Sequence, residues 1–152
     1  MKQKSFYIWL FFSILVAVAI FISSSIEGSD SGAASMAIAD RLANLIGLSS
    51  ETMNFLVRKS AHFTVFALLA FCLVGTFKHI NTKKKYVLLI AWGIASLYGI
   101  LDEVHQYFVP GRVFAITDML INSAGALFGV FIMYLLGKIK NKASKSKRTL
   151  HM

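Results

Sequence analysis

The side chains best suited to chemistry lie in residues 100–122, which read ILDEVHQYFVPGRVFAITDMLIN. This stretch combines carboxylates, an imidazole, a guanidinium and two amides, the groups that transfer protons, hold cations or bind anions. Strongly apolar segments flank it on both sides. Ionisable groups at membrane depth are costly, so their presence there indicates a functional site. The polar residues are Asp102, Glu103, His105, Gln106, Arg112, Asp118 and Asn122.

A second polar group opens an earlier apolar block and consists of Arg58, Lys59 and His62. Arg58 and His62 are four residues apart, so they share one face of a helix. An alternative is that Arg58 and Lys59 only extend to lipid headgroups, as basic residues at the ends of membrane helices do.

Four apolar blocks must position these residues, at about 6–22, 61–77, 86–101 and 116–136. Each block is close to the ~20 residues that cross a bilayer core as a helix. The sequence therefore predicts an all-α membrane protein: one four-helix transmembrane domain over residues 1–137 and a basic cytoplasmic tail over 138–152. A cleaved signal peptide is the alternative for the first block, but that block is longer than the usual apolar region of such peptides.

The segment between the first two blocks is expected to begin with a flexible turn at residues 28–32. After it, Ala34, Ile38, Leu42 and Leu45 recur at spacings of three and four. This pattern predicts a short amphipathic helix, either lying on the outer membrane surface or covering the bundle. Ser50 is expected to cap the helix that follows.

The formal net charge of +9 would favour nucleic-acid binding in a soluble protein, but the positions of the basic residues favour a membrane role. Twelve of the sixteen lysines and arginines lie before the first block, between the second and third, or after the fourth. The positive-inside rule then predicts that both termini are cytoplasmic. No nucleic-acid partner is expected. The single cysteine, Cys72, excludes an internal disulfide.

Small residues indicate where the helices pack closely. One such line is Ala91, Ala95 and Gly99, which Glu103 continues, and another helix carries Gly125 and Gly129 in a GxxxG motif. Polar pairs four residues apart occur on three helices and are predicted to converge at one membrane level, because facing lipid would be costly for all of them. These pairs are Arg58/His62, Asp102/Gln106 and Asp118/Asn122.

The ordered motifs RKSAHFTVFALLAF, LDEVHQYFVPGR and TDMLINSAGALFG resemble the VanZ family of small membrane proteins. The resemblance runs from about residue 21 to 129. It implies a multi-pass protein of the bacterial cell envelope and suggests a contribution to tolerance of teicoplanin, a lipid-bearing glycopeptide. It carries over no catalytic residues.

Our main functional hypothesis is a binding site that faces outward. Arg58, Lys59, His62 and Arg112 would bind an anionic group, because arginine grips phosphate or carboxylate at two points. The expected partners are membrane lipids, with an anionic lipid headgroup or a lipid-bearing glycopeptide as the ligand. Because it follows a Pro-Gly turn, Arg112 is expected to be the cation least needed to hold the helices together. The other residues of this ligand-binding hypothesis are Asp102, Glu103, His105, Gln106, Asp118 and Asn122.

Three alternatives remain open. An intramembrane enzyme could draw an acid/base pair or hard metal ligands from the two histidines and three carboxylates, but neither HExxH nor a nucleophile elbow is present. The charged residues could instead form a purely structural network, or line a thin transport pathway. No catalytic residue, metal ligand or cofactor is therefore assigned from the sequence.

Overall fold

The computed structural model describes the backbone of residues 2–149 and the side chains of residues 3–140, and this part of the chain is helical apart from short connections. Four helices are long and apolar enough to cross a membrane, and the remaining helix, the second in the chain, is amphipathic. This confirms the all-α fold class with four candidate transmembrane helices and an additional helix between the first two of them. The helices are α1 (Lys2–Ser24), α2 (Gly28–Ile46), α3 (Ser50–Phe77), α4 (Lys84–Tyr107) and α5 (Ile116–Thr149).

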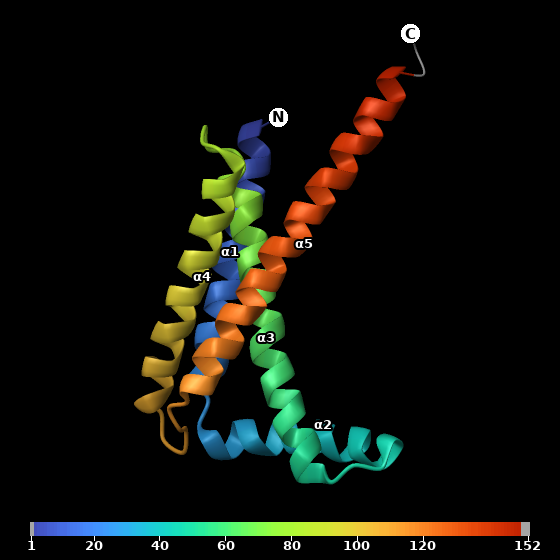
Figure 1. Ribbon diagram of the computed structural model, residues 1–152. Helices are drawn as coiled ribbons and strands as arrows, with labels where there is room; N and C mark the ends of the chain where they lie inside the picture. The colour runs from blue at the N-terminus through green and yellow to red at the C-terminus, as the bar shows by residue number, and fades with distance from the viewer. Residues whose placement is uncertain (1, 150–152) are drawn as a thin grey trace.

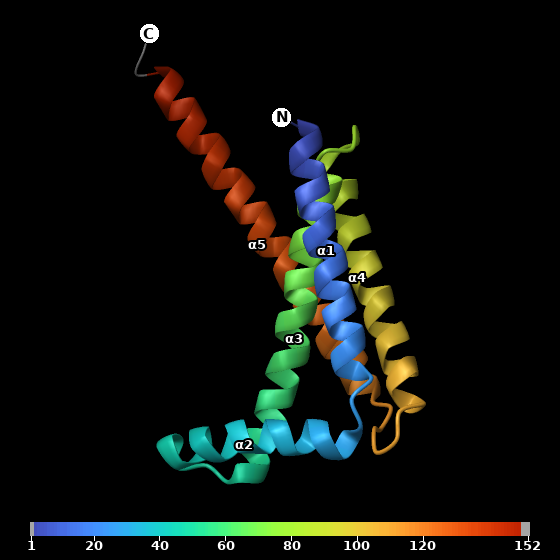
Figure 2. The ribbon, with the colours of Figure 1, turned by 180° about the vertical axis from the view of Figure 1, so that it is seen from behind.

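The four long helices form a bundle whose two ends differ (Figure 1). The starts of α1 and α4 and the far end of α5 lie at one end, here called the terminal end. At the other end α2 lies across the bundle, close to the loop between α4 and α5, and the reverse view shows the same arrangement (Figure 2). We call this the α2 end. All seven acidic residues belong to segments at the α2 end.

Helix α3 is the central element, because it packs against each of the other four helices. Its side chains Phe66, Leu69, Ala70 and Leu73 are buried in the main apolar core, together with Ile20 of α1. The small residues of α4 and α5 complete this core, as their spacing predicts. They are Ala91 and Ala95 of α4 and Ala126 of α5.

Two glycines of α5 allow its closest approach to α3. A Cβ atom on Gly125 would collide with the backbone carbonyl of Phe63, and one on Gly129 would collide with that of Ala67. The GxxxG motif therefore lies at a helix contact, where glycine lets the two backbones meet. This contact fixes the height of α5 relative to α3, and hence which polar side chains face each other at the α2 end.

Helix α2 differs from its prediction in where it begins. Residues 28–32, expected to form a flexible turn, are its first residues, and the Gly28 N–H donates a hydrogen bond of 3.0 Å to Pro110 O. Gly28 lies so close to Gly111 that a Cβ atom would strike the Gly111 carbonyl. Gly28 is therefore needed for the docking of the α4–α5 loop, which anchors the start of α2.

The buried face of α2 also differs from the predicted stripe. Ala39 and Ala43 pack against Met53 of α3, whereas Ile38 and Leu45 are exposed. The exposed apolar face is the one that an interfacial helix would place in lipid.

Other helix limits differ by a few residues from those expected. Ser49, not Ser50, caps α3, since its hydroxyl accepts a hydrogen bond from the Thr52 N–H. Helix α4 ends at Tyr107, before the turn that contains Pro110. Helix α5 continues without a break into the predicted basic tail, whose side chains after Lys140 lie outside the described residues.

Candidate functional site

Side chains from three helices meet at the α2 end in what we call the ionic cluster. Lys59 of α3 forms a hydrogen-bonded ion pair with Asp118 of α5. His62, one turn further along α3, lies with Nδ1 3.1 Å from Asn122 Oδ1 and 4.0 Å from Glu103 Oε1. The members of the ionic cluster are Lys59, His62, Glu103, Asp118 and Asn122.

The helix geometry explains these pairings. Lys59 and His62 are three residues apart on α3, and Asp118 and Asn122 are four apart on α5, so each pair lies on one face. Glu103 continues the small-residue line of α4, which includes Gly99. Asn122 packs against Gly99 so closely that a Cβ atom added to Gly99 would lie 2.9 Å from Asn122 Cβ. The predicted convergence of helices occurs, but Lys59, not Arg58, meets the acid of α5.

The cluster contains polar atoms without hydrogen-bond partners among the described residues. Glu103 and Asn122 are both fully buried. Glu103 Oε2 accepts a hydrogen bond of 3.3 Å from the Ala115 N–H, but Oε1 has no such partner, and neither has Asn122 Nδ2. Buried polar groups of folded proteins are nearly always paired, so these two atoms need an explanation.

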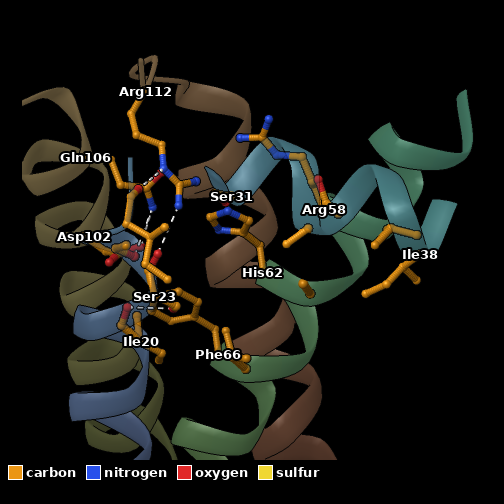
Figure 3. A pocket seen from close by; sticks show the side chains of 17 residues that line it. Ile20, Ser23, Ser31, Ile38, Arg58, His62, Phe66, Asp102, Gln106 and Arg112 are labelled. Carbon is orange, nitrogen blue, oxygen red and sulfur yellow. Dashed lines mark hydrogen bonds between the residues drawn. The ribbon is translucent and has the colours of Figure 1, made fainter. Parts of the chain in front are cut away.

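A cavity of about 310 Å³ lies beside the ionic cluster, and we call it the polar pocket (Figure 3). One part of its wall is polar and is formed by Arg58, His62, Asp102, Gln106 and Arg112. Asp102 and Gln106 are buried, and Gln106 Nε2 donates to Asp102 Oδ2 at 2.9 Å and to Ser24 Oγ at 3.3 Å. The rest of the wall is mostly apolar and includes Ile20, Ile38, Val57, Val65 and Phe66.

Arg112 lines the polar pocket but also holds the fold together. Its Nε donates to Ile26 O at 3.2 Å and its Nη2 donates to Ser23 O at 3.0 Å. It thereby satisfies carbonyls at and just beyond the C-terminal end of α1, where a cation is favourable. The expectation that Arg112 is the cation least needed structurally is therefore wrong. The turn sequence locates Arg112 in a loop but does not reveal that this loop lies against α1.

Arg58 projects toward the same space as Arg112 and His62 (Figure 3). Neither guanidinium makes a salt bridge within the described residues. Burial, and then the nearby charge of Arg58, lower the pKa of the Arg112 guanidinium from its usual value, and the charges of Asp102 and Glu103 oppose this.

His105 lies apart from the other predicted residues. Its ring stacks on Phe21 of α1 with centroids 4.7 Å apart, and its Nε2 is 3.0 Å from Ser25 Oγ. It belongs to neither the ionic cluster nor the lining of the polar pocket.

Four serines of the pocket lining were not among the predicted site residues. Ser23 and Ser24 come from the end of α1, and Ser31 and Ser35 come from α2. The signal in α2 was available in the sequence, because Ser31 and Ser35 are four residues apart on the face that includes Ala34 and Ile38. The assignment of residues 28–32 to a turn concealed it.

The helices and the buried polar residues together define a multi-pass α-helical membrane protein with a polar site near one end of its bundle. The family model described as VanZ/LLP1 matches residues 9–137. The chain therefore belongs to the VanZ/LLP1 family, as the sequence motifs predict. No curated protein and no solved structure matches the chain.

Proposed function

We propose that this VanZ-family protein binds the anionic headgroup of a membrane lipid in the polar pocket. The observation that carries the proposal is the pair of guanidiniums, Arg58 and Arg112, which face one cavity without a salt bridge among the described residues. A phosphate between them would form a charge-assisted interaction with each guanidinium.

The lining of the pocket suits a lipid better than a free anion. Ile38 and Val65 line it and are also exposed on the surface of the bundle, so an apolar path joins the pocket to the region that lipid chains occupy. A cavity of about 310 Å³ holds a headgroup and the first carbons of its chains, while the remaining chain length stays in the bilayer.

The pocket would face the outside of the cell. The terminal end carries twelve of the sixteen basic residues, which favours a cytoplasmic location for it under the positive-inside rule. At the outer surface, a bound envelope lipid or the lipid chain of a teicoplanin-type glycopeptide would meet the same arginines. We propose on this basis that the protein contributes to glycopeptide tolerance in the cell envelope.

Native mass spectrometry of the protein extracted from membranes tests the binding proposal. The wild type should retain an anionic lipid, and Arg58→Gln should lose most of it. Arg41→Gln is the matched control, because Arg41 is an exposed arginine of α2 that does not line the polar pocket. Equal lipid retention in all three proteins would refute the role of the pocket.

Reporter fusions and a tolerance assay test the remaining parts. A reporter that functions only in the cytoplasm should be active after Met152 and inactive near Gly32, and the reverse would invert the proposed topology. In cells, Arg58→Gln should reduce tolerance to a lipid-bearing glycopeptide while Arg41→Gln does not. Unchanged tolerance in Arg58→Gln would show that lipid binding in the polar pocket is not the cause of glycopeptide tolerance.

A further inference from the structure

We propose that the ionic cluster is a binding site for a divalent transition-metal ion, with His62, Glu103 and Asp118 as its ligands. Each residue offers one ligand atom, and these atoms all lie within 4.8 Å of one another. The residues come from three different helices, so only the folded bundle brings them together. This inference does not depend on lipid binding in the polar pocket.

The ligand set indicates the class of ion. One imidazole nitrogen and two carboxylate oxygens suit zinc or manganese, whereas magnesium and calcium prefer oxygen ligands alone. Ligand bonds of about 2.1 Å place neighbouring ligand atoms about 3.4 Å apart in a tetrahedral site. The three side chains would therefore close by about an ångström around the ion. His62 Nδ1 and Glu103 Oε1, at 4.0 Å, are already near this spacing.

A second observation points to the same ion. Glu103 is fully buried, and its Oε1 faces His62 without a hydrogen-bond partner among the described residues. A carboxylate oxygen left unpaired in a membrane helix is expensive, and a cation would satisfy it. Asn122 Oδ1 lies 3.1 Å from the same His62 Nδ1, so an ion bound to Nδ1 would replace this contact.

The ionic cluster has more carboxylates than lysines, so its charge favours a further cation. Lys59 pairs with Asp118, so the two carboxylates of the cluster share one lysine. A second cavity, about 340 Å³, is lined by Lys59 and Asp118 and also by the exposed residues Glu51 and Val113, which connect it to the surface. It offers a route for the ion and a space into which Lys59 can turn when the ion takes Asp118.

Metal titration distinguishes this binding site from a purely structural cluster. The full-length protein in detergent is freed of metal with a chelator and titrated with zinc and with manganese. One ion should bind per chain. Loss of an outer-shell partner lowers metal affinity by about 10- to 100-fold. We expect a loss of metal affinity at least this large in each of the three ligand variants, His62→Gln, Glu103→Gln and Asp118→Asn. Replacing any of the other three histidines by glutamine should leave the affinity unchanged.

Lys59→Met keeps the test decisive if the ligand variants do not fold. Without the competing lysine, zinc should bind more tightly and raise the melting temperature more than it does in the wild type. Arg58→Gln should bind zinc normally, which distinguishes this site from the lipid site. Absence of zinc and manganese binding by the wild type, full affinity in the three ligand variants, or an equal or smaller zinc effect in Lys59→Met would overturn the proposal.

Discussion

The middle of the bundle and its α2 end are built in opposite ways. In the middle, small residues let α3, α4 and α5 pack tightly around Phe66 and Leu73. At the α2 end, three carboxylates and three cations belong to the ionic cluster or line the polar pocket: Asp102, Glu103 and Asp118, and Arg58, Lys59 and Arg112. Two buried polar atoms of the ionic cluster, Glu103 Oε1 and Asn122 Nδ2, lack hydrogen-bond partners among the described residues. The middle is therefore stabilised by close apolar packing, whereas the α2 end contains buried polar groups that are costly when they lose their partners.

Removal of an ion-pair partner at the α2 end should have the largest effect on stability. Asp118→Ala leaves Lys59 unpaired. Removal of one partner of a buried ion pair lowers the free energy of unfolding by about 3–5 kcal/mol. Because the Lys59 and Asp118 side chains are 22% and 12% exposed, we expect a loss of about 3 kcal/mol. The free energy of unfolding in mixed detergent micelles measures it. Exchanging the two charges should recover part of the loss, and unaltered stability in Asp118→Ala would mean that the pair contributes nothing.

Close packing in the middle of the bundle is tested by a pair of glycines. Gly129→Ala places a methyl group against the Ala67 carbonyl and should destabilise the protein by about 1–3 kcal/mol through overpacking. Gly93 on α4 has no atom within 4 Å of a built Cβ, so Gly93→Ala should be neutral or stabilising by about 0.5–1 kcal/mol. Similar changes in stability in both variants would show that the effect of alanine comes from its helix propensity and not from its contact with the neighbouring helix.

Arg112 distinguishes a structural arginine from a purely ligand-binding one. Arg112→Ala removes two hydrogen bonds to carbonyls at the end of α1 and should cost about 1.5 kcal/mol, the lower end for bonds to charged groups because these lie near the surface. Arg112→Lys should cost nearly as much, since one ammonium lacks the planar fork that reaches both carbonyls. Wild-type thermal stability in both variants would restore the view that Arg112 serves only a ligand.

The smallest loss of stability is expected at the hydroxyl pair of Ser13 and Thr76, which lie 3.2 Å apart near the terminal end of α3. Thr76→Val keeps the shape of the side chain but removes its contact with Ser13. Interhelical hydrogen bonds of this kind contribute about 0.6 kcal/mol in membrane proteins. Unfolding measurements should show a change of that size, and a loss above about 2 kcal/mol would show that the bundle depends on polar contacts far from the α2 end as well.

Periodic patterns predicted most of the fold. Apolar blocks near the span length located four helices, and the spacing of Gly125 and Gly129 located a close contact. The start of α2 was missed because its glycines and serines read as a turn, whereas the docked α4–α5 loop holds them in a helix. Local propensity cannot report a contact between segments about eighty residues apart.

The sequence indicates which polar residues gather at the α2 end but not how they pair. Sequence spacing places Arg58 and His62 on one face, yet it is Lys59 that pairs with Asp118. The separation of His105 from the cluster depends on the position of α1, since Ser25 and Phe21 bind its ring. Such choices depend on helix rotation, and one residue changes the direction of a side chain by about 100°.

Lipid binding at the α2 end is tested most directly by comparing thermal stability with and without an anionic lipid. Phosphatidylglycerol at about 100 times its dissociation constant should stabilise the wild type by about 2.7 kcal/mol relative to phosphatidylcholine. Arg58→Gln should melt like the wild type in phosphatidylcholine, because Arg58 makes no salt bridge among the described residues, yet it should lose the response to phosphatidylglycerol. Arg41→Gln should keep that response. An equal response in Arg58→Gln, or none in the wild type, would contradict the claim that the α2 end is a lipid-binding site.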